Sequence, residues 1–251
     1  MASSFPKSAP ITFLLIHGAW HYGHSWDGVR KHLEAAGHTV HSPSVAFEDA
    51  NGKPYHTLDE VVKGLLNYVE EKALNDFVLV GHSWGGIIIT DMAVKLPEGK
   101  IKRLVYYSAF VPLEGEGLFD CVPPLARTLY GGLADQHPDR LFPCPYPLFR
   151  DAFIGDADAE QAAEVYKSLR LQPYGTWDDG VKNTESFHSF PPKIPRSYLL
   201  ADADCSAPPG VYEGNAAKLG FFRKVLVHGS HEVMFTNPEA LAKAIVTAGR
   251  D

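Results

Sequence analysis

The sequence predicts a doubly wound α/β fold with a mostly parallel sheet. From Ile11 onward, short apolar runs alternate with amphipathic stretches, which is typical of parallel strands joined by crossover helices on both faces of a sheet. Hydrophobic residues make up 45% and charged residues 21% of the chain, a composition that supports a large buried core. The length of 251 residues fits one large α/β domain of roughly 250 residues. We therefore expect a single domain over residues 11–251.

Six short apolar runs are predicted to form the sheet. They lie at residues 11–16, 39–42, 77–80, 103–108, 197–201 and 223–227. Between two of them, Thr57 and Glu60 form a capping box ahead of apolar residues at helical spacing, which predicts a helix that extends to about residue 73. Near the end of the chain, Asn237 and Pro238 supply a cap and a first-turn proline, so they predict the last helix.

Residues 112–195 break this alternation. Repeated prolines, among them Pro143, Pro145 and Pro147, interrupt the pattern, and only short helices such as one over residues 159–170 are expected between them. A long irregular segment inside a compact domain is commonly a functional insertion. We therefore interpret residues 112–195 as an inserted cap.

Charge and hydropathy exclude several classes of function. The chain has 23 Lys and Arg against 30 Asp and Glu, a net charge of -7, and its longest basic cluster lies at residues 100–103, so neither nucleic acid nor a membrane surface is expected as a partner. No apolar run approaches the roughly 20 residues that span a bilayer. Residues 1–10 carry no apolar stretch of the kind found in secretory signals. They are expected to be a loose leader, which indicates a cytoplasmic location.

The cysteines and the clustered histidines predict neither a cofactor nor a metal site. The three cysteines are widely spaced and include no C-x-x-C pair, so free thiols are expected. They are Cys121, Cys144 and Cys205. The three histidines within residues 17–24 lack the helical pairing with a carboxylate that metalloproteases use, and a structural or pocket-lining role is expected for them.

The segment Gly81-His82-Ser83-Trp84-Gly85 matches the pattern G-x-S-x-G, directly after an apolar strand pattern and before a helical one. In this context the pattern predicts a sharp turn that holds a serine hydroxyl above the end of a sheet. The two glycines avoid clashes that side chains would create in such a turn. Ser83 is therefore the predicted nucleophile.

A serine attacks poorly at neutral pH unless a base removes its proton, and in this fold the acid and the histidine follow the serine in chain order. Asp202 and Asp204 follow one predicted strand, and His228 and His231 follow the last. We favour His231 as the base, because it lies on a glycine-containing loop three residues beyond its strand, and expect His228 to pack at the strand end. We favour Asp204 over Asp202 as the acid, because it lies further past its strand and precedes a rigid Pro-containing loop. Asp202 remains the alternative.

A tetrahedral oxyanion needs two preorganised backbone donors. The residue after the nucleophile supplies one, which makes the Trp84 N–H the first candidate. The loop after the first strand supplies the other, and there Gly18 lets the backbone bend so that the Ala19 N–H points at the substrate.

Together these segments resemble the α/β-hydrolase superfamily, and more narrowly its small-esterase branch, which includes plant methylesterases and the related hydroxynitrile lyases. The resemblance rests on residues 15–21 with Trp26, residues 80–86, residues 108–112, Asp204 and His231. It covers roughly residues 11–112 and 197–247 and leaves the cap out. It implies an α/β-hydrolase fold, a cofactor-independent serine hydrolase and a catalytic triad of Ser83, Asp204 and His231.

The hydroxynitrile lyases of this branch carry a threonine where this chain has Gly18, and a lysine beside the catalytic histidine. Here Ser230 and Glu232 flank His231. The missing lyase features disfavour cleavage of a cyanohydrin. Haloalkane dehalogenases of this fold use an aspartate nucleophile, which Ser83 also disfavours.

The expected function is hydrolysis of a small, largely apolar ester through an acyl-enzyme, with no cofactor and no metal. The expected partner is a small-molecule substrate, bound with side chains of the cap. The other residues expected to bind it are Gly18, Trp20, Trp84, Phe110, Met234 and Phe235. A lactonase, an amidase or a carbamate hydrolase with the same triad is the alternative, followed by a carbon–carbon lyase or hydrolase and by a non-enzymatic ligand receptor on this scaffold. The oligomeric state stays open, with a homodimer as one possibility.

Overall fold

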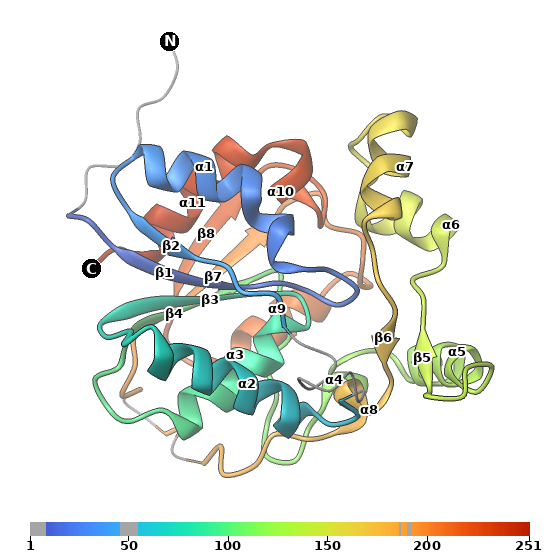
Figure 1. Cartoon of the computed structure of the whole chain (residues 1–251), viewed down its shortest axis with the longest axis horizontal. Helices are drawn as coiled ribbons and strands as arrows, with labels where there is room; N and C mark the ends of the chain where they lie inside the picture. The colour runs from blue at the N-terminus through green and yellow to red at the C-terminus, as the bar shows by residue number, and fades with distance from the viewer. Residues whose placement is uncertain (1–8, 46–54, 186, 190–191) are drawn as a thin grey trace.

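A six-stranded parallel sheet runs through the structure, a computed structural model that describes residues 9–45, 55–185, 187–189 and 192–251 (Figure 1). The strand order is β2-β1-β3-β4-β7-β8, and each neighbouring pair is parallel. The strands are β1 (Thr12–Ile16), β2 (Thr39–His41), β3 (Phe77–His82), β4 (Ile101–Tyr107), β7 (Arg196–Ala201) and β8 (Arg223–Val227). The predicted doubly wound α/β fold is confirmed. The expected leader at residues 1–10 lies almost entirely outside the described residues.

Both faces of the sheet are covered by helices, as Figure 1 shows: α1 (Asp27–Ala35) and α11 (Pro238–Gly249) lie on one face, and α2 (Leu58–Glu71) and α3 (Gly85–Lys95) on the other. Alternate residues of one strand enter opposite cores, because successive side chains of a strand point to opposite faces. In β1, for example, Phe13 packs in the core under α1 and α11, whereas Leu14 packs in the core under α2 and α3. A strand buried on both faces explains the continuous apolar runs of the sequence.

The strand next to the predicted nucleophile is longer than the apolar run suggested. β3 was expected to end at Val80, but Gly81 and His82 still pair with Tyr106 and Tyr107 of β4. The ladder therefore continues to the residue immediately before Ser83. The remaining strand ends agree with the prediction within two residues.

The helices begin where the sequence indicates. The Thr57 side chain accepts a hydrogen bond from the Glu60 N–H, and the Glu60 carboxylate accepts one from the Thr57 N–H, so the predicted capping box of α2 is confirmed. Asn237 caps α11, and Pro238 is its first residue. The shorter helices of the main fold are η1 (Gly23–Trp26), α9 (Val211–Ala217) and α10 (Val233–Thr236).

Residues 112–195, here named the cap segment, connect β4 to the neighbouring strand β7. The segment contains short helices and one two-stranded antiparallel sheet, which appear on the right of Figure 1. The elements are α4 (Leu118–Cys121), α5 (Pro124–Ala134), β5 (Leu141–Phe142), α6 (Tyr146–Leu148), the π-helix η2 (Phe149–Phe153), α7 (Ala159–Lys167), β6 (Gln172–Pro173) and α8 (Gly175–Asp178). The segment is therefore more regular than its prolines suggested.

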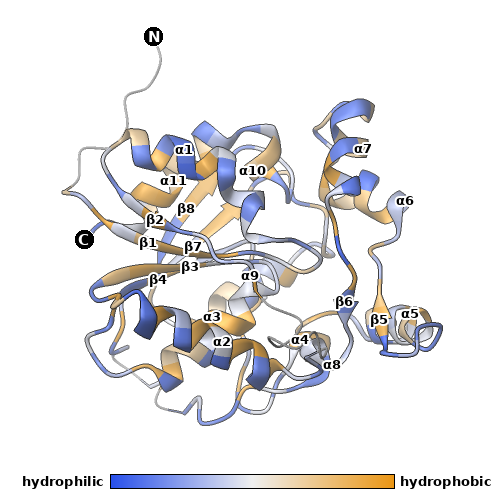
Figure 2. Cartoon of the chain, viewed as in Figure 1, coloured by the Kyte–Doolittle hydropathy of each residue, from blue (hydrophilic) through white to orange (hydrophobic). Residues whose placement is uncertain are grey.

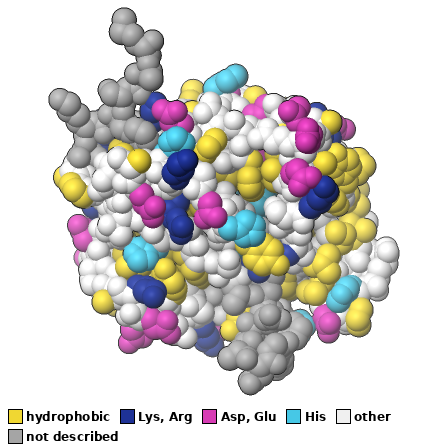
Figure 3. Space-filling view, turned by 45° about the horizontal axis from the view of Figure 1, so that its top comes forward, with side chains coloured by type: hydrophobic (Ala, Val, Ile, Leu, Met, Phe, Trp, Pro, Cys, Tyr) yellow, Lys and Arg dark blue, Asp and Glu magenta, His cyan; other side chains and the backbone are white. Residues whose placement is uncertain are grey.

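The surface is polar over most of the main fold and more apolar over the cap segment. Figure 2 shows hydrophilic residues on the outer sides of α1, α2 and α7, with hydrophobic residues along the sheet. In Figure 3 hydrophobic side chains gather at the right, the side on which the cap segment lies in Figure 1. Most of the exposed large hydrophobic residues belong to this segment, and they are Leu113, Leu125, Leu129, Tyr146 and Leu171. Across the described residues, every helix is too short or too polar to cross a bilayer.

Candidate active site

Ser83 lies in a strained turn between the end of β3 and the start of α3. Its φ is 54°, a left-handed backbone conformation that non-glycine residues rarely adopt. The turn has no room for side chains on its glycines, because a Cβ at Gly81 would lie 2.6 Å from the Gly85 oxygen, and a Cβ at Gly85 would lie 2.9 Å from the Ile16 oxygen. The turn therefore has the local geometry that the G-x-S-x-G pattern predicts, with the nucleophile candidate at the carboxyl end of a central strand.

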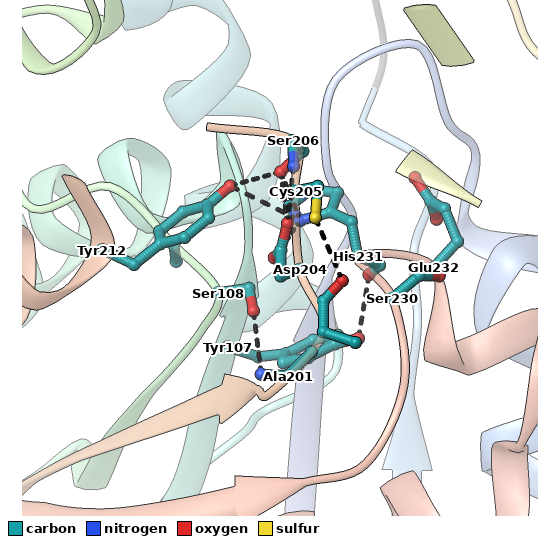
Figure 4. A network of polar contacts seen from close by, with 12 residues as sticks. Tyr107, Ser108, Ala201, Asp204, Cys205, Ser206, Tyr212, Ser230, His231 and Glu232 are labelled. Carbon is teal, nitrogen blue, oxygen red and sulfur yellow. Dashed lines mark hydrogen bonds and ion pairs between the residues drawn. The ribbon is translucent and has the colours of Figure 1, made fainter. Parts of the chain in front are cut away.

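His231 and Asp204 form a buried pair at the carboxyl ends of β8 and β7. Nδ1 of His231 lies 2.6 Å from Oδ2 of Asp204, and both side chains are 1% exposed. The Ser206 hydroxyl donates to Oδ1 of Asp204 at 2.6 Å and lies 3.0 Å from Nδ1 of His231 (Figure 4). The alternative acid Asp202 is paired instead with His228 in an exposed contact. This geometry favours Asp204 over Asp202 and His231 over His228.

His231 lies close to Ser83 without bonding to it. Its Nε2 is buried and makes no hydrogen bond within the described residues. The ring of His82, the residue before Ser83, lies with its centroid 4.4 Å from that of His231. Ser206, which contacts His231, lines the same cavity as Ser83. The structure thus brings the three predicted triad residues into one neighbourhood and leaves the Ser83–His231 hydrogen bond unformed.

Burial and neighbouring charges shift the pKa values of His231 and Asp204 in opposite directions. Burial alone would lower the pKa of His231, but the neighbouring Asp204 carboxylate, aided by Glu232, raises it above its ordinary value of 6.5. For Asp204, burial acts to raise the pKa, while the imidazole of His231 and the hydrogen bonds from Ser206 lower it below its usual value. Asp204 is therefore charged at neutral pH, and it stabilises the protonated form of His231.

The predicted oxyanion loop packs directly against Ser83. A Cβ at Gly18 would lie 3.1 Å from the Ser83 Cβ and 2.9 Å from Nδ1 of His82, so a side chain here would require the loop or its neighbours to shift. Ala19 lines the cavity that contains Ser83, and Trp84, the other predicted donor residue, is the N-cap of α3. Both candidate donor residues thus flank the serine.

A cavity of about 310 Å³ opens over Ser83. Most of its wall comes from the cap segment, including Tyr130 of α5, Phe153 of η2 and Trp177 of α8. Lysine, arginine, aspartate and glutamate are absent from the lining among the described residues. The cavity therefore favours a small, uncharged and mostly apolar ligand.

Only some of the residues expected to form the pocket line the cavity. Trp20 and Phe110 line the cavity. Met234 packs in the core under α1 and α11, and Phe235 stacks on His21 at 5.8 Å between ring centroids, which corrects the expectation that these two line the pocket. They lie within the short helix α10, which starts at Val233 and packs against η1 and α11 instead of lining the cavity. Gly18 is absent from the cavity lining and packs against Ser83.

His17, the first of the clustered histidines, contacts the main chain through both ring nitrogens. His17 Nδ1 lies 2.8 Å from the Gly18 oxygen, and its Nε2 accepts a hydrogen bond from the Val45 N–H. Burial, followed by the charge of Arg170, lowers the pKa of His17 well below its ordinary value. In the described part of the chain, no group of three metal-ligating side chains comes together. The three cysteines are free thiols, as expected.

Several residues that support the site were missed by sequence reasoning. Tyr107 donates a hydrogen bond from its hydroxyl to the His231 carbonyl at 2.9 Å. Asp156 of the cap segment accepts the Ser230 N–H at 3.0 Å, and Tyr212 of α9 stacks on His231. The position of Tyr107 at a strand end was a usable signal, whereas nothing in the local sequence around Asp156 indicates that it reaches the histidine loop.

Comparison with known proteins agrees with this geometry. The model of the alpha/beta hydrolase family matches residues 13–244. A carbendazim hydrolyzing esterase from Nocardioides sp. (strain SG-4G) is 29% identical over 262 residues, which cover 94% of this chain and 99% of that protein. Methylesterase 7 of Arabidopsis thaliana is 26% identical over 256 residues, 96% of each chain.

Among solved structures, an alpha/beta-hydrolase from a Paenibacillus species superimposes with a TM-score of 0.90 at 34% identity, covering 96% of this chain and 100% of that one. That protein is described as extracellular and as sharing structural and functional homology with tobacco salicylic acid binding protein 2. The cytoplasmic location expected from the sequence therefore stays a prediction.

Proposed function

The chain belongs to the alpha/beta hydrolase family, and we propose that it is a carboxylic ester hydrolase that uses Ser83 as its nucleophile. One observation carries the proposal: a serine in a strained strand-to-helix turn faces an apolar cavity, beside a buried histidine paired with an aspartate. The relatives named as esterases support the same bond type.

The hydrogen bonding of His231 fits the role of general base. Because Nδ1 faces the Asp204 carboxylate at 2.6 Å, the neutral imidazole carries its proton on Nδ1 and has a lone pair on Nε2. Nε2 is the atom that lacks a partner within the described residues. A rotation of the Ser83 side chain toward Nε2 completes the hydrogen bond through which the serine proton leaves.

The reaction proceeds in two halves. The Ser83 oxygen attacks the ester carbonyl as His231 takes the serine proton, and the N–H groups of Ala19 and Trp84 stabilise the oxyanion. His231 then protonates the leaving alcohol, which yields an acyl-Ser83 enzyme. Water, deprotonated by the same imidazole, releases the acid and restores the serine. Asp204 orients and stabilises the imidazolium without taking the proton.

The cavity selects the substrate. Its volume of about 310 Å³ and its wall without charged side chains in the described residues favour a neutral ester with a compact aromatic or aliphatic acyl group. Two of the lining residues beside Ser83, Ser206 and Tyr212, carry hydroxyls. Both hydroxyls are already directed at the His231–Asp204 pair, so they do not provide a site for a substrate carboxylate.

A substrate panel tests the proposal. Aryl esters, methyl esters, lactones, amides, carbamates and a cyanohydrin are incubated with wild type and with Ser83→Ala, and a fluorophosphonate probe is used to label the serine. We expect turnover of neutral esters and loss of that turnover in Ser83→Ala. After labelling, the mass of the peptide that contains Ser83 should increase by the mass of the bound probe. Activity confined to the lactone, amide, carbamate or cyanohydrin arm, or probe labelling without turnover, contradicts the ester assignment.

A further inference from the structure

The peptide group between Ala19 and Trp20 is held at both ends by buried side chains. The Trp20 N–H donates to Oε1 of Gln172 at 3.1 Å, and the Ala19 carbonyl oxygen lies 2.7 Å from Nδ1 of His21. Trp20 has a φ of 62°, a left-handed conformation that is strained for a bulky residue. The two hydrogen bonds therefore stabilise a strained turn that begins at the proposed oxyanion donor.

His21 contacts the main chain with one ring nitrogen and Glu232 with the other. Nδ1 faces a carbonyl oxygen, which can only accept, so Nδ1 carries a proton. Nε2 lies 3.4 Å from Oε2 of Glu232, within ion-pair distance. Glu232 is fully buried, and its carboxylate accepts no hydrogen bond within the described residues. His21 is the side chain that lies within ion-pair distance of Glu232 in that part of the chain.

Hydrogen bonds within the cap segment hold the side chain of Gln172 in one orientation. Its Nε2 donates to the Thr176 hydroxyl at 2.7 Å, and that hydroxyl donates onward to the Pro173 oxygen at 2.6 Å. Gln172 and Thr176 are both fully buried. These two hydrogen bonds orient the amide so that Oε1 of Gln172 accepts from the Trp20 N–H, and the amide cannot flip without losing hydrogen bonds.

We propose that Gln172 and the His21–Glu232 pair are positioning residues for the oxyanion hole. They hold the turn at Trp20 so that the preceding N–H, that of Ala19, points at the oxyanion. Because Glu232 directly follows His231, the same contacts connect the loop of the general base to the loop of the oxyanion donor. The inference rests on the proposed function of Ser83 and Ala19 and adds residues that touch neither substrate nor reacting atoms.

The experiment separates positioning from general stability. An oxyanion hole acts mainly on the transition state, so its distortion lowers kcat more than it changes KM. We expect Gln172→Leu and Glu232→Met each to lower kcat for an ester about 10- to 100-fold, with KM changed less than about threefold. Inhibition by a boronic acid, which forms a tetrahedral adduct on Ser83, weakens by a similar factor.

Conservative variants test whether the hydrogen bonds carry the effect. Gln172→Glu keeps an acceptor for the Trp20 N–H, and Glu232→Gln keeps a polar side chain of the same size against Nε2 of His21, so both restore most of kcat. Ser197→Ala is the control, because it removes a buried hydrogen bond to the Ala248 oxygen on the far part of β7. It lowers Tm and leaves kcat and boronic acid inhibition unchanged.

The outcomes are distinct. Unchanged kcat in Gln172→Leu and Glu232→Met overturns the inference. A fall in kcat that accompanies a changed KM and a lowered Tm, and that the conservative variants do not restore, also overturns it. If an apolar variant fails to fold, Gln172→Asn, which withdraws the acceptor by one methylene, carries the same expectation. Ester turnover that survives Ser83→Ala contradicts the proposed function itself, whereas Ser83-dependent turnover that is insensitive to these variants contradicts only the inference.

Discussion

The Tyr107 hydroxyl donates a hydrogen bond to the main-chain carbonyl of His231 at 2.9 Å, with both residues buried (Figure 4). Tyr107 is the last residue of β4 and His231 follows β8, so this contact joins two strand ends that β7 separates in the sheet. It fixes the main chain of the residue that serves as the proposed base, while Asp204 fixes the side chain.

Tyr107→Phe should therefore affect both stability and catalysis. The change removes the Tyr107 hydrogen bond to the His231 carbonyl, which lowers the free energy of unfolding by about 1–3 kcal/mol. It also leaves the imidazole of His231 less rigidly positioned. Thermal unfolding and kcat measure the two effects. Tyr198→Phe is a matched control, because its hydroxyl donates to the Ala109 oxygen from a similarly buried position. It should lower Tm without the same fall in kcat, and equal falls in both variants would assign Tyr107 a purely structural role.

Gly18→Ala should lower turnover while the protein stays folded. The added methyl group lies within 3.1 Å of the Ser83 Cβ and 2.9 Å of His82, so the oxyanion loop must move away. Misplacing one oxyanion donor costs up to about 10²- to 10³-fold in kcat, and we expect a fall within about this limit. Gly64→Ala provides the comparison, since a Cβ there meets nothing within 4 Å. Wild-type activity in Gly18→Ala would show that the loop does not contribute a donor.

Asp204→Asn and Asp202→Asn should differ sharply in activity. Asp204 lies 2.6 Å from His231 and is buried, whereas Asp202 contacts His228 at the surface. Removing the charge that stabilises the imidazolium lowers kcat by up to about 10⁴-fold in a triad. Steady-state kinetics on a neutral ester measure both variants. A greater loss in Asp202→Asn than in Asp204→Asn would exchange the two roles.

The activity should depend on pH through His231. The protonated imidazole cannot accept the serine proton, and Asp204 and Glu232 overcome the effect of burial and raise the pKa of His231 above 6.5. The value of kcat/KM should therefore fall as pH decreases, with a midpoint above 6.5. His228→Ala, which changes an exposed histidine, should leave this midpoint in place. A midpoint below 6.5 in wild type would contradict the assignment.

Leu129→Glu should weaken substrate binding with little change in stability. Leu129 is 44% exposed and lines the cavity over Ser83, so a carboxylate there opposes an apolar ester. We expect a higher KM and a nearly constant Tm. Leu113→Glu serves as the control, because Leu113 is 41% exposed and lies outside the cavity lining. An equal change in KM for both variants would indicate a surface charge effect instead of a pocket contact.

The sequence was sufficient to predict the sheet and the neighbourhood of the nucleophile, because both follow local rules. A strand buried on both faces shows as an apolar run, and the turn at Ser83 demands glycines at fixed positions. Asp204 and His231 could be selected because parallel strands end at one edge of the sheet. Each of these inferences uses residues close to one another in the chain.

The cavity wall could not be predicted in the same way. Tyr130, Phe153 and Trp177 come together through packing between short elements of the cap segment, and no periodic pattern relates them. Gln172 reaches Trp20 across 152 positions of sequence. Met234 and Phe235 are predicted to line the pocket, but they lie in α10, which packs against η1 and α11. Proximity in sequence to the predicted base therefore did not predict a place in the cavity wall.

The cap segment enters and leaves the main fold between two adjacent strands, β4 and β7. One continuous stretch of the chain therefore supplies most of the cavity wall, and replacing that stretch leaves the register of the six-stranded sheet unaltered. Gln172 limits such replacement, because it lies within the stretch and bonds to Trp20 outside it. A transplanted stretch that lacked an equivalent acceptor would bring a new specificity together with a misaligned catalytic loop.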